Sequence, residues 1–66
     1  MGKTLWFLTN GVSLVDVFTR KTDAESEYMK FQDDPDFDYY EYYSLDIDEL
    51  EDYPEEYDLA LEQGYL

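Results

Sequence analysis

The stretch KTLWFLTNGVSLVDVFT, residues 3–19, decides the fold because it has the pattern of two strands joined by a turn. β-Branched and aromatic residues, which are enriched in strands, fill both halves. Asn10-Gly11 lies between them, and this dipeptide adopts positive φ at low cost, as the two-residue type I′ hairpin turn requires. We therefore predict a hairpin with strands at about 4–9 and 12–19.

After the hairpin, the spacing of the apolar residues becomes helical. Ala24, Tyr28 and Phe31 recur at i, i+4 and i+7 and form one apolar stripe. Pro35 ends this pattern, because proline disfavours the helical conformation of the residue before it. The spacing predicts a helix at about 23–33.

The segment FDYYEYYSLDID, residues 37–48, alternates between two faces and predicts a half-buried strand. The face that we expect against the core is apolar except at Glu41, which indicates an edge position or a local bulge. Tyrosine suits both faces, because its ring packs while its hydroxyl stays in water. The core face holds Phe37, Tyr39, Glu41, Tyr43, Leu45 and Ile47, and the outer face holds Asp38, Tyr40, Tyr42, Ser44, Asp46 and Asp48.

A second, shorter helix is predicted from Pro54, because proline suits the first helical position. Tyr57, Ala60 and Leu61 line one side of it, and Gly64 is a suitable C-terminal stop. The order ββαβα predicts an α+β fold in one domain. We expect a three-stranded antiparallel sheet in the order 2-1-3, one helix packed on a face and a short C-terminal helix.

The charge of the chain is strongly negative and lies in its second half. Four Lys and Arg stand against 18 Asp and Glu, a formal net charge of −14, and every base precedes residue 31. A surface that only maintains solubility normally mixes both signs of charge. A field of this sign repels nucleic acid and anionic membranes and attracts basic surfaces, so we expect no direct nucleic-acid or membrane binding.

Histidine and cysteine are absent from the sequence, which removes the usual general base, the thiol nucleophile and the soft metal ligands. The acidic segments DDPDFD and DIDELED lack the glycine and the spacing of an EF-hand calcium loop. We therefore expect neither an enzyme nor a bound metal or cofactor. The sequence has no signal-peptide or transmembrane pattern, which predicts a cytoplasmic protein.

The carboxylates of the second half form a candidate partner-binding surface. Same-face residues of a strand recur at about 6.7 Å, and phosphates along one DNA strand lie roughly 6–7 Å apart. Asp46 and Asp48 have this spacing on the outer face, where Tyr40 and Tyr42 either anchor a partner or pack against a neighbouring strand or the C-terminal helix. We expect the row to continue through Asp33, Asp34, Asp36 and Asp38 on one side, and through Glu49, Glu51, Asp52, Glu55, Glu56 and Asp58 on the other.

The segment YYEYYSLDIDEL, residues 39–50, is similar to a tyrosine-rich strand and the following segment in a small phage inhibitor of uracil-DNA glycosylase. The small, acidic and aromatic-rich chain also resembles, by type, the DNA-mimic inhibitors of phages and mobile elements, which include anti-CRISPR and anti-restriction proteins. The resemblance implies an inhibitor that occupies the basic DNA- or RNA-binding channel of a host defence or repair protein. Its carboxylates would pair with Lys and Arg of that protein.

Two other functions stay open. A small adaptor would bind a protein partner through its sheet edge or through exposed tyrosines. A homodimeric structural protein would pair an exposed strand across a two-fold axis, and a homodimer is compatible with either of the other functions.

Overall fold

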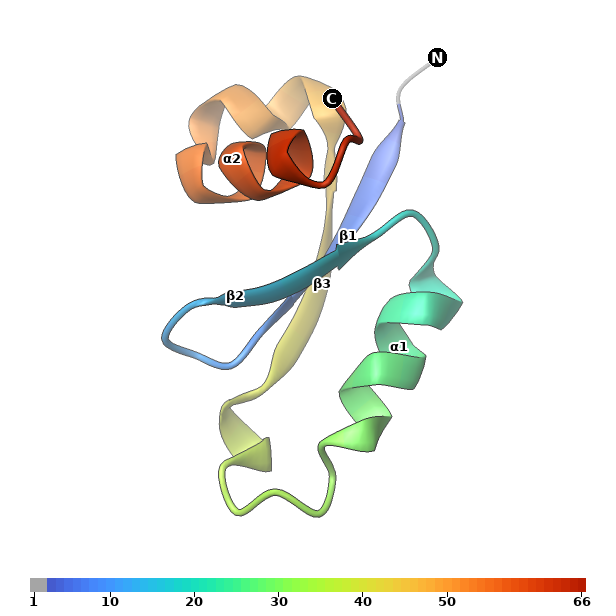
Figure 1. Cartoon of the computed structure of the whole chain (residues 1–66), viewed down its shortest axis with the longest axis vertical. Helices are drawn as coiled ribbons and strands as arrows, with labels where there is room; N and C mark the ends of the chain where they lie inside the picture. The colour runs from blue at the N-terminus through green and yellow to red at the C-terminus, as the bar shows by residue number, and fades with distance from the viewer. Residues whose placement is uncertain (1–2) are drawn as a thin grey trace.

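The chain, described over residues 3–66 in a computed structural model, forms a three-stranded antiparallel sheet in the order β2-β1-β3 with two α-helices (Figure 1). This architecture confirms the α+β class and the strand order predicted from the sequence. The elements in chain order are β1 (Thr4–Thr9), β2 (Leu14–Phe18), α1 (Lys21–Lys30), the 3-10 helix η1 (Phe37–Tyr39), β3 (Glu41–Asp46), the 3-10 helix η2 (Ile47–Asp52) and α2 (Pro54–Glu62).

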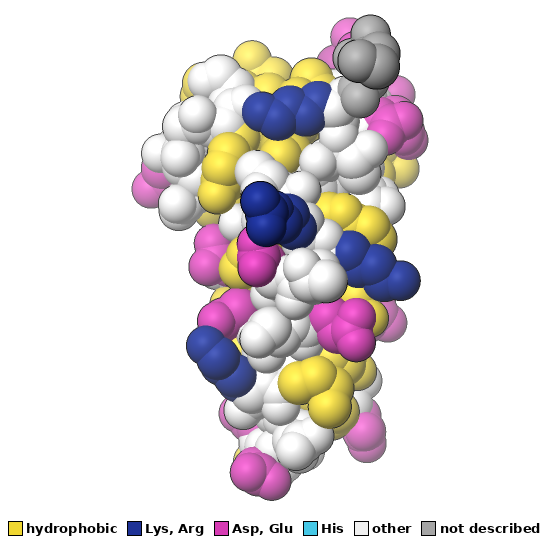
Figure 2. Space-filling view, turned by 90° about the vertical axis from the view of Figure 1, so that its right-hand side faces the viewer, with side chains coloured by type: hydrophobic (Ala, Val, Ile, Leu, Met, Phe, Trp, Pro, Cys, Tyr) yellow, Lys and Arg dark blue, Asp and Glu magenta, His cyan; other side chains and the backbone are white. Residues whose placement is uncertain are grey.

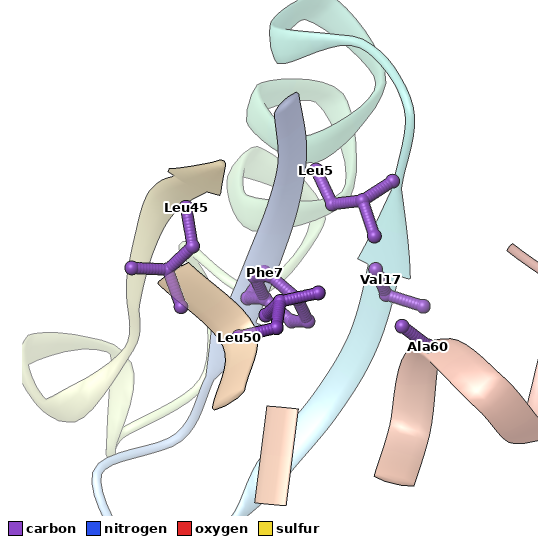
Figure 3. Packing of buried hydrophobic residues seen from close by; sticks show 6 residues of the cluster. All are labelled: Leu5, Phe7, Val17, Leu45, Leu50 and Ala60. Atoms are coloured by element: carbon purple, nitrogen blue, oxygen red, sulfur yellow. The ribbon is translucent and has the colours of Figure 1, made fainter. Parts of the chain in front are cut away.

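The central strand β1 buries side chains on both of its faces. Leu5 and Phe7 are fully buried on one face, and Leu8 is fully buried on the other, because successive strand residues point to opposite sides. The first face packs against Leu50 of η2 and Ala60 of α2, together with residues of β2 and β3 (Figure 3). Burying a large aliphatic or aromatic side chain contributes about 1.5–3 kcal/mol, so this cluster is the main source of stability.

Helix α1 covers the second face of the sheet. Its buried residue is Ala24, and the predicted stripe faces the sheet: Tyr28 contacts Tyr42 at 5.0 Å between ring centroids, and Phe31 stacks on Tyr40 at 4.6 Å. The helix spans Lys21–Lys30, so it begins two residues and ends three residues earlier than the predicted range 23–33. The two helices therefore lie on opposite faces of the sheet.

The turn between β1 and β2 differs from the predicted two-residue type I′ turn. Gly11 has a φ of +89°, but no residue other than glycine has positive φ in the described chain, so Asn10 does not adopt the type I′ conformation. Instead the Asn10 Oδ1 accepts hydrogen bonds from the backbone N–H groups of Val12 and Ser13, at 2.9 and 2.8 Å. This side-chain bridge closes a longer loop, and β2 begins at Leu14 rather than at residue 12.

The third strand is shorter than the predicted range 37–48. Its six residues pair one to one with β1, from Thr4 opposite Asp46 to Thr9 opposite Glu41, and the pairing ends after one further bond, from the Ile47 N–H to the Lys3 carbonyl at 2.8 Å. The flanking residues therefore turn into the 3-10 helices η1 and η2. Glu41, the exception on the apolar face, is exposed because it lies at the first position of this edge strand.

The ends of α2 agree with the sequence, but its buried side does not. Pro54 occupies the first turn, and Gly64, with a φ of +88°, terminates the helix while Tyr65 N–H donates to the Ala60 carbonyl at 2.9 Å. Ala60 is buried as predicted, whereas Tyr57 and Leu61 are exposed. Leu59 packs in their place, because the helix meets the sheet with a different part of its circumference.

The two glycines with positive φ allow a matched test of the loop between β1 and β2. Gly64→Ala should cost about 1–2 kcal/mol of unfolding free energy, because its φ of +88° is strained for alanine although nothing lies within 4 Å of the added Cβ. Gly11→Ala should cost more, because the added Cβ would also lie 3.0 Å from the Tyr39 carbonyl oxygen. Urea denaturation measures both values, and equal losses would contradict the close contact between this loop and η1.

Candidate protein-interaction surface

The predicted acidic row is divided into two groups that lie at opposite ends of the molecule. The chain is elongated, with extents of 37 × 22 × 17 Å, and the loop before β3 lies at one end of the long axis while η2 and α2 lie at the other (Figure 1). We call the group in the loop the tip cluster; it consists of Asp33, Asp34, Asp36 and Asp38. We call the other group the α2 cluster; it consists of Asp46, Asp48, Glu49, Glu51, Asp52, Glu55, Glu56, Asp58 and Glu62.

Asp46 and Asp48 do not have the strand spacing that the sequence predicts. Asp46 is the last residue of β3, and Asp48 lies in η2, so the repeat of about 6.7 Å along a strand does not join them. The Asp46 carboxylate instead accepts a hydrogen bond from the Thr4 hydroxyl at 2.9 Å and forms a capping box with Glu49 at the start of η2. These bonds end the strand and position the first turn of η2.

Tyr40 and Tyr42 pack against neighbouring aromatic side chains rather than standing free on an outer face. Tyr40 stacks on Phe31 with an interplanar angle of 16°, and the Tyr42 ring lies 5.0 Å from Tyr28 and 6.3 Å from Trp6. Both tyrosines are half-buried between β3 and α1. Of the two roles open for them, the structure shows packing: both pack against the aromatic residues Tyr28 and Phe31, and Tyr42 also packs against Trp6 of the neighbouring strand β1, rather than against the C-terminal helix.

Two further carboxylates are bonded within the fold. Asp34 accepts a hydrogen bond from the Asp36 N–H at 2.8 Å, which stabilises the turn after α1. Glu56 of α2 accepts a hydrogen bond from the Tyr43 hydroxyl at 2.8 Å and so joins α2 to β3. Burial of Tyr43 and this hydrogen bond to an anionic acceptor raise the pKa of the phenol well above its ordinary value of 10.0.

The remaining predicted carboxylates are exposed, and within residues 3–66 their side chains form no hydrogen bond or ion pair. They are Asp33, Asp36 and Asp38 in the tip cluster, and Asp48, Glu51, Asp52, Glu55 and Asp58 in the α2 cluster.

Basic side chains lie away from the α2 cluster in sequence and neutralise little of the charge. Lys30 and Glu27 form the one ion pair within the described residues, at 2.6 Å along α1. Figure 2 shows the side of the molecule that carries α1, where Lys and Arg side chains are scattered among acidic ones. The segment of residues 46–62, which forms the α2 cluster, has nine carboxylates and no base, and Lys3 borders it through the hydrogen bond from the Ile47 N–H to the Lys3 carbonyl at 2.8 Å.

The sequence prediction omitted some residues at the α2 end. Glu62 lies four residues after Asp58, so the two side chains are neighbours on the helix surface. Tyr53, Tyr57 and Leu61 follow the same four-residue spacing and are all exposed. The four-residue spacing of the acidic pair and of the apolar residues is visible in the sequence. Only the packing of α2 shows that these side chains are exposed.

The hydrogen bond between Tyr43 and Glu56 leads to a stability prediction. Tyr43→Phe should lower the unfolding free energy at neutral pH by about 1–2 kcal/mol, because it leaves a partly buried carboxylate without its donor. Tyr57→Phe is the matched control, since its exposed hydroxyl has no partner within residues 3–66. Urea denaturation of both variants checks the value, and equal losses would contradict a structural role for this bond.

The same variant has a defined pH dependence. The pKa of Tyr43 in the folded protein lies above its unfolded value of 10.0. The contribution of the Tyr43 hydroxyl to the free energy of unfolding is therefore fully present below pH 10.0. The contribution falls at higher pH, because the unfolded chain releases the proton first. The stability difference between wild type and Tyr43→Phe should therefore narrow above pH 10.0, as followed by denaturation at several pH values.

Among residues 3–66, no helix combines the length and the apolar composition that a membrane crossing requires. The carboxylates of this part of the chain form no group of three or more with a geometry suited to a metal ion. Comparisons with protein-family models, with curated proteins and with solved structures give no match to this chain.

Proposed function

We propose that this protein is an inhibitor that mimics nucleic acid and blocks the basic DNA- or RNA-binding surface of a host defence or repair protein. An anti-CRISPR or anti-restriction protein is the favoured form, and an inhibitor of uracil-DNA glycosylase is the next. The observation that carries the proposal is the α2 cluster, because the ordered segment of residues 46–62 holds nine carboxylates and no base. The proposal places the protein in the cytoplasm of the host cell.

The helical part of the α2 cluster has a spacing suited to phosphate mimicry. Glu55, Asp58 and Glu62 are three and four residues apart on α2, and such neighbours have Cβ atoms about 5–6 Å apart. Successive phosphates of one DNA strand lie roughly 6–7 Å apart. The side chains can therefore meet Lys and Arg groups placed for a nucleic-acid backbone, and the helix holds their order.

The charge of the α2 cluster also has a cost for folding, which supports a role beyond solubility. Like charges four residues apart on a helix, such as Asp58 and Glu62, destabilise the helix by about 0.2–0.5 kcal/mol. The end of the molecule stays folded because Leu50 and Ala60 are buried in the core. A basic partner would remove this repulsion on binding and would associate fast through electrostatic steering.

A displacement assay tests the proposal. Labelled nucleic acid is bound in turn to a guide-loaded CRISPR nuclease, to a restriction enzyme and to uracil-DNA glycosylase, and the protein is titrated into each complex. We expect displacement from at least one target, with an affinity that falls about tenfold or more as salt is raised, because salt screens exposed charges. Displacement from none of them, or displacement that salt leaves unchanged, would contradict the proposal.

Matched charge variants locate the binding surface. The triple variant Glu55→Gln, Asp58→Asn, Glu62→Gln and the triple variant Asp33→Asn, Asp36→Asn, Asp38→Asn each remove three exposed negative charges, one set from each end. Displacement by the first should weaken by about tenfold or more, because charge-assisted hydrogen bonds are lost. The second should weaken much less, and equal weakening in the same assay would contradict binding at the α2 end.

A further inference from the structure

The outer side of α2 carries an apolar stripe that the fold leaves uncovered. Tyr57 and Leu61 are 42 and 51% exposed, and their four-residue spacing places them next to each other on α2. Tyr53, 41% exposed, precedes the first turn of the helix, and its carbonyl accepts a hydrogen bond from the Tyr57 N–H at 2.9 Å. We call these three residues the α2 stripe. Exposed large apolar side chains in a row mark an interaction site more often than scattered single ones do.

The α2 stripe is not a part of the core that happens to reach the surface. The contacts of α2 with the sheet are made by other residues of the helix, the buried Ala60 and the partly buried Leu59, whereas Tyr57 and Leu61 stay exposed. Tyr57 also borders an open hollow between η2 and α2, which is lined by Leu50, Glu51, Pro54, Tyr57 and Asp58. The hollow thus has an apolar base with a carboxylate on each of its two elements.

The charge around the α2 stripe decides which kind of partner fits it. The stripe lies within the α2 cluster, and residues 31–66 contain no Lys or Arg. A second copy of the chain would bring nine carboxylates against nine, and like charges in a desolvated contact are strongly unfavourable. The complementary partner is therefore a protein surface with Lys and Arg around apolar side chains.

We propose that the α2 stripe is the apolar centre of a protein interface, and that it binds a basic surface through apolar contacts within a rim of carboxylates. This inference rests on the proposed function and deepens it, because it assigns the anchoring role to Tyr53, Tyr57 and Leu61 in place of Tyr40 and Tyr42. Tyrosine is enriched among the residues that dominate binding energy, and a charged rim around such a centre excludes water from it.

Two peptide probes separate apolar anchoring from charge alone. One is a peptide of lysine and leucine that forms an amphipathic helix, and the other has the same lysines with serine in place of each leucine. We expect the protein to bind the leucine peptide about tenfold more tightly by calorimetry, because a well-placed apolar contact contributes a factor of this size. Equal affinity for both peptides would overturn the inference, while leaving the charge-based displacement of nucleic acid unaffected.

Variants of exposed apolar residues provide the matched control. The double variant Tyr57→Ser, Leu61→Ser should lose most of the preference for the leucine peptide. The double variant Val15→Ser, Met29→Ser removes side chains of similar exposure, 40 and 47%, from β2 and α1, and it should keep the preference. The reverse result, or equal loss in both variants, would overturn the assignment to α2.

Two further measurements distinguish binding at the α2 stripe from binding near residues 37–42 and from dimerisation. Amide chemical-shift changes in the wild-type protein should concentrate in residues 53–61 when the leucine peptide is added, a result that needs no variant to fold. Changes concentrated in residues 37–42 would overturn the inference. Light scattering should show a wild-type monomer at physiological salt, and a dimer that the Tyr57→Ser, Leu61→Ser variant abolishes would identify a second copy as the occupant and would also overturn it.

Discussion

The structure depends on one constraint: β1 must be buried on both faces. Leu5 and Phe7 on one face and Leu8 on the other are fully removed from solvent, and a chain of 66 residues has few elements with which to cover them. β2 and β3 pair with its two edges, α1 takes one face, and α2 with η2 takes the other. The other elements of the fold are therefore arranged around this central strand.

The burial of both faces explains why the carboxylates gather at the ends of the molecule. Tyr40 and Tyr42 fill the space between β3 and α1, which leaves little of the sheet for an open acidic face. The acidic residues therefore lie where the chain leaves β3, in the loop before it and in η2 and α2 after it. Asp46 lies at the boundary between β3 and η2. Its carboxylate accepts a hydrogen bond from Thr4 at the end of the strand and forms a capping box with Glu49 at the start of η2.

The candidate surface combines a negative charge that is evident from the sequence with exposed apolar residues that only the structure identifies. The excess of negative charge in the second half of the chain could be recognised from composition alone, since no base follows residue 30. The α2 stripe could not, because Tyr57 and Leu61 share the spacing of core residues with Ala60, and of these three only Ala60 is buried. Tyr40 and Tyr42 show the opposite case, since a polar-looking strand face is covered by α1.

The sequence by itself determined the order of the elements, the hairpin, the ends of α2 and the sign and place of the net charge, because these depend on local conformation and composition. Only the tertiary structure decided where β3 ends, which sides of β3 and α2 are buried, and that the acidic residues form two separate clusters. The physical reason is pairing and packing. β3 extends only as far as β1 can pair with it, and a helix buries whichever side meets the sheet.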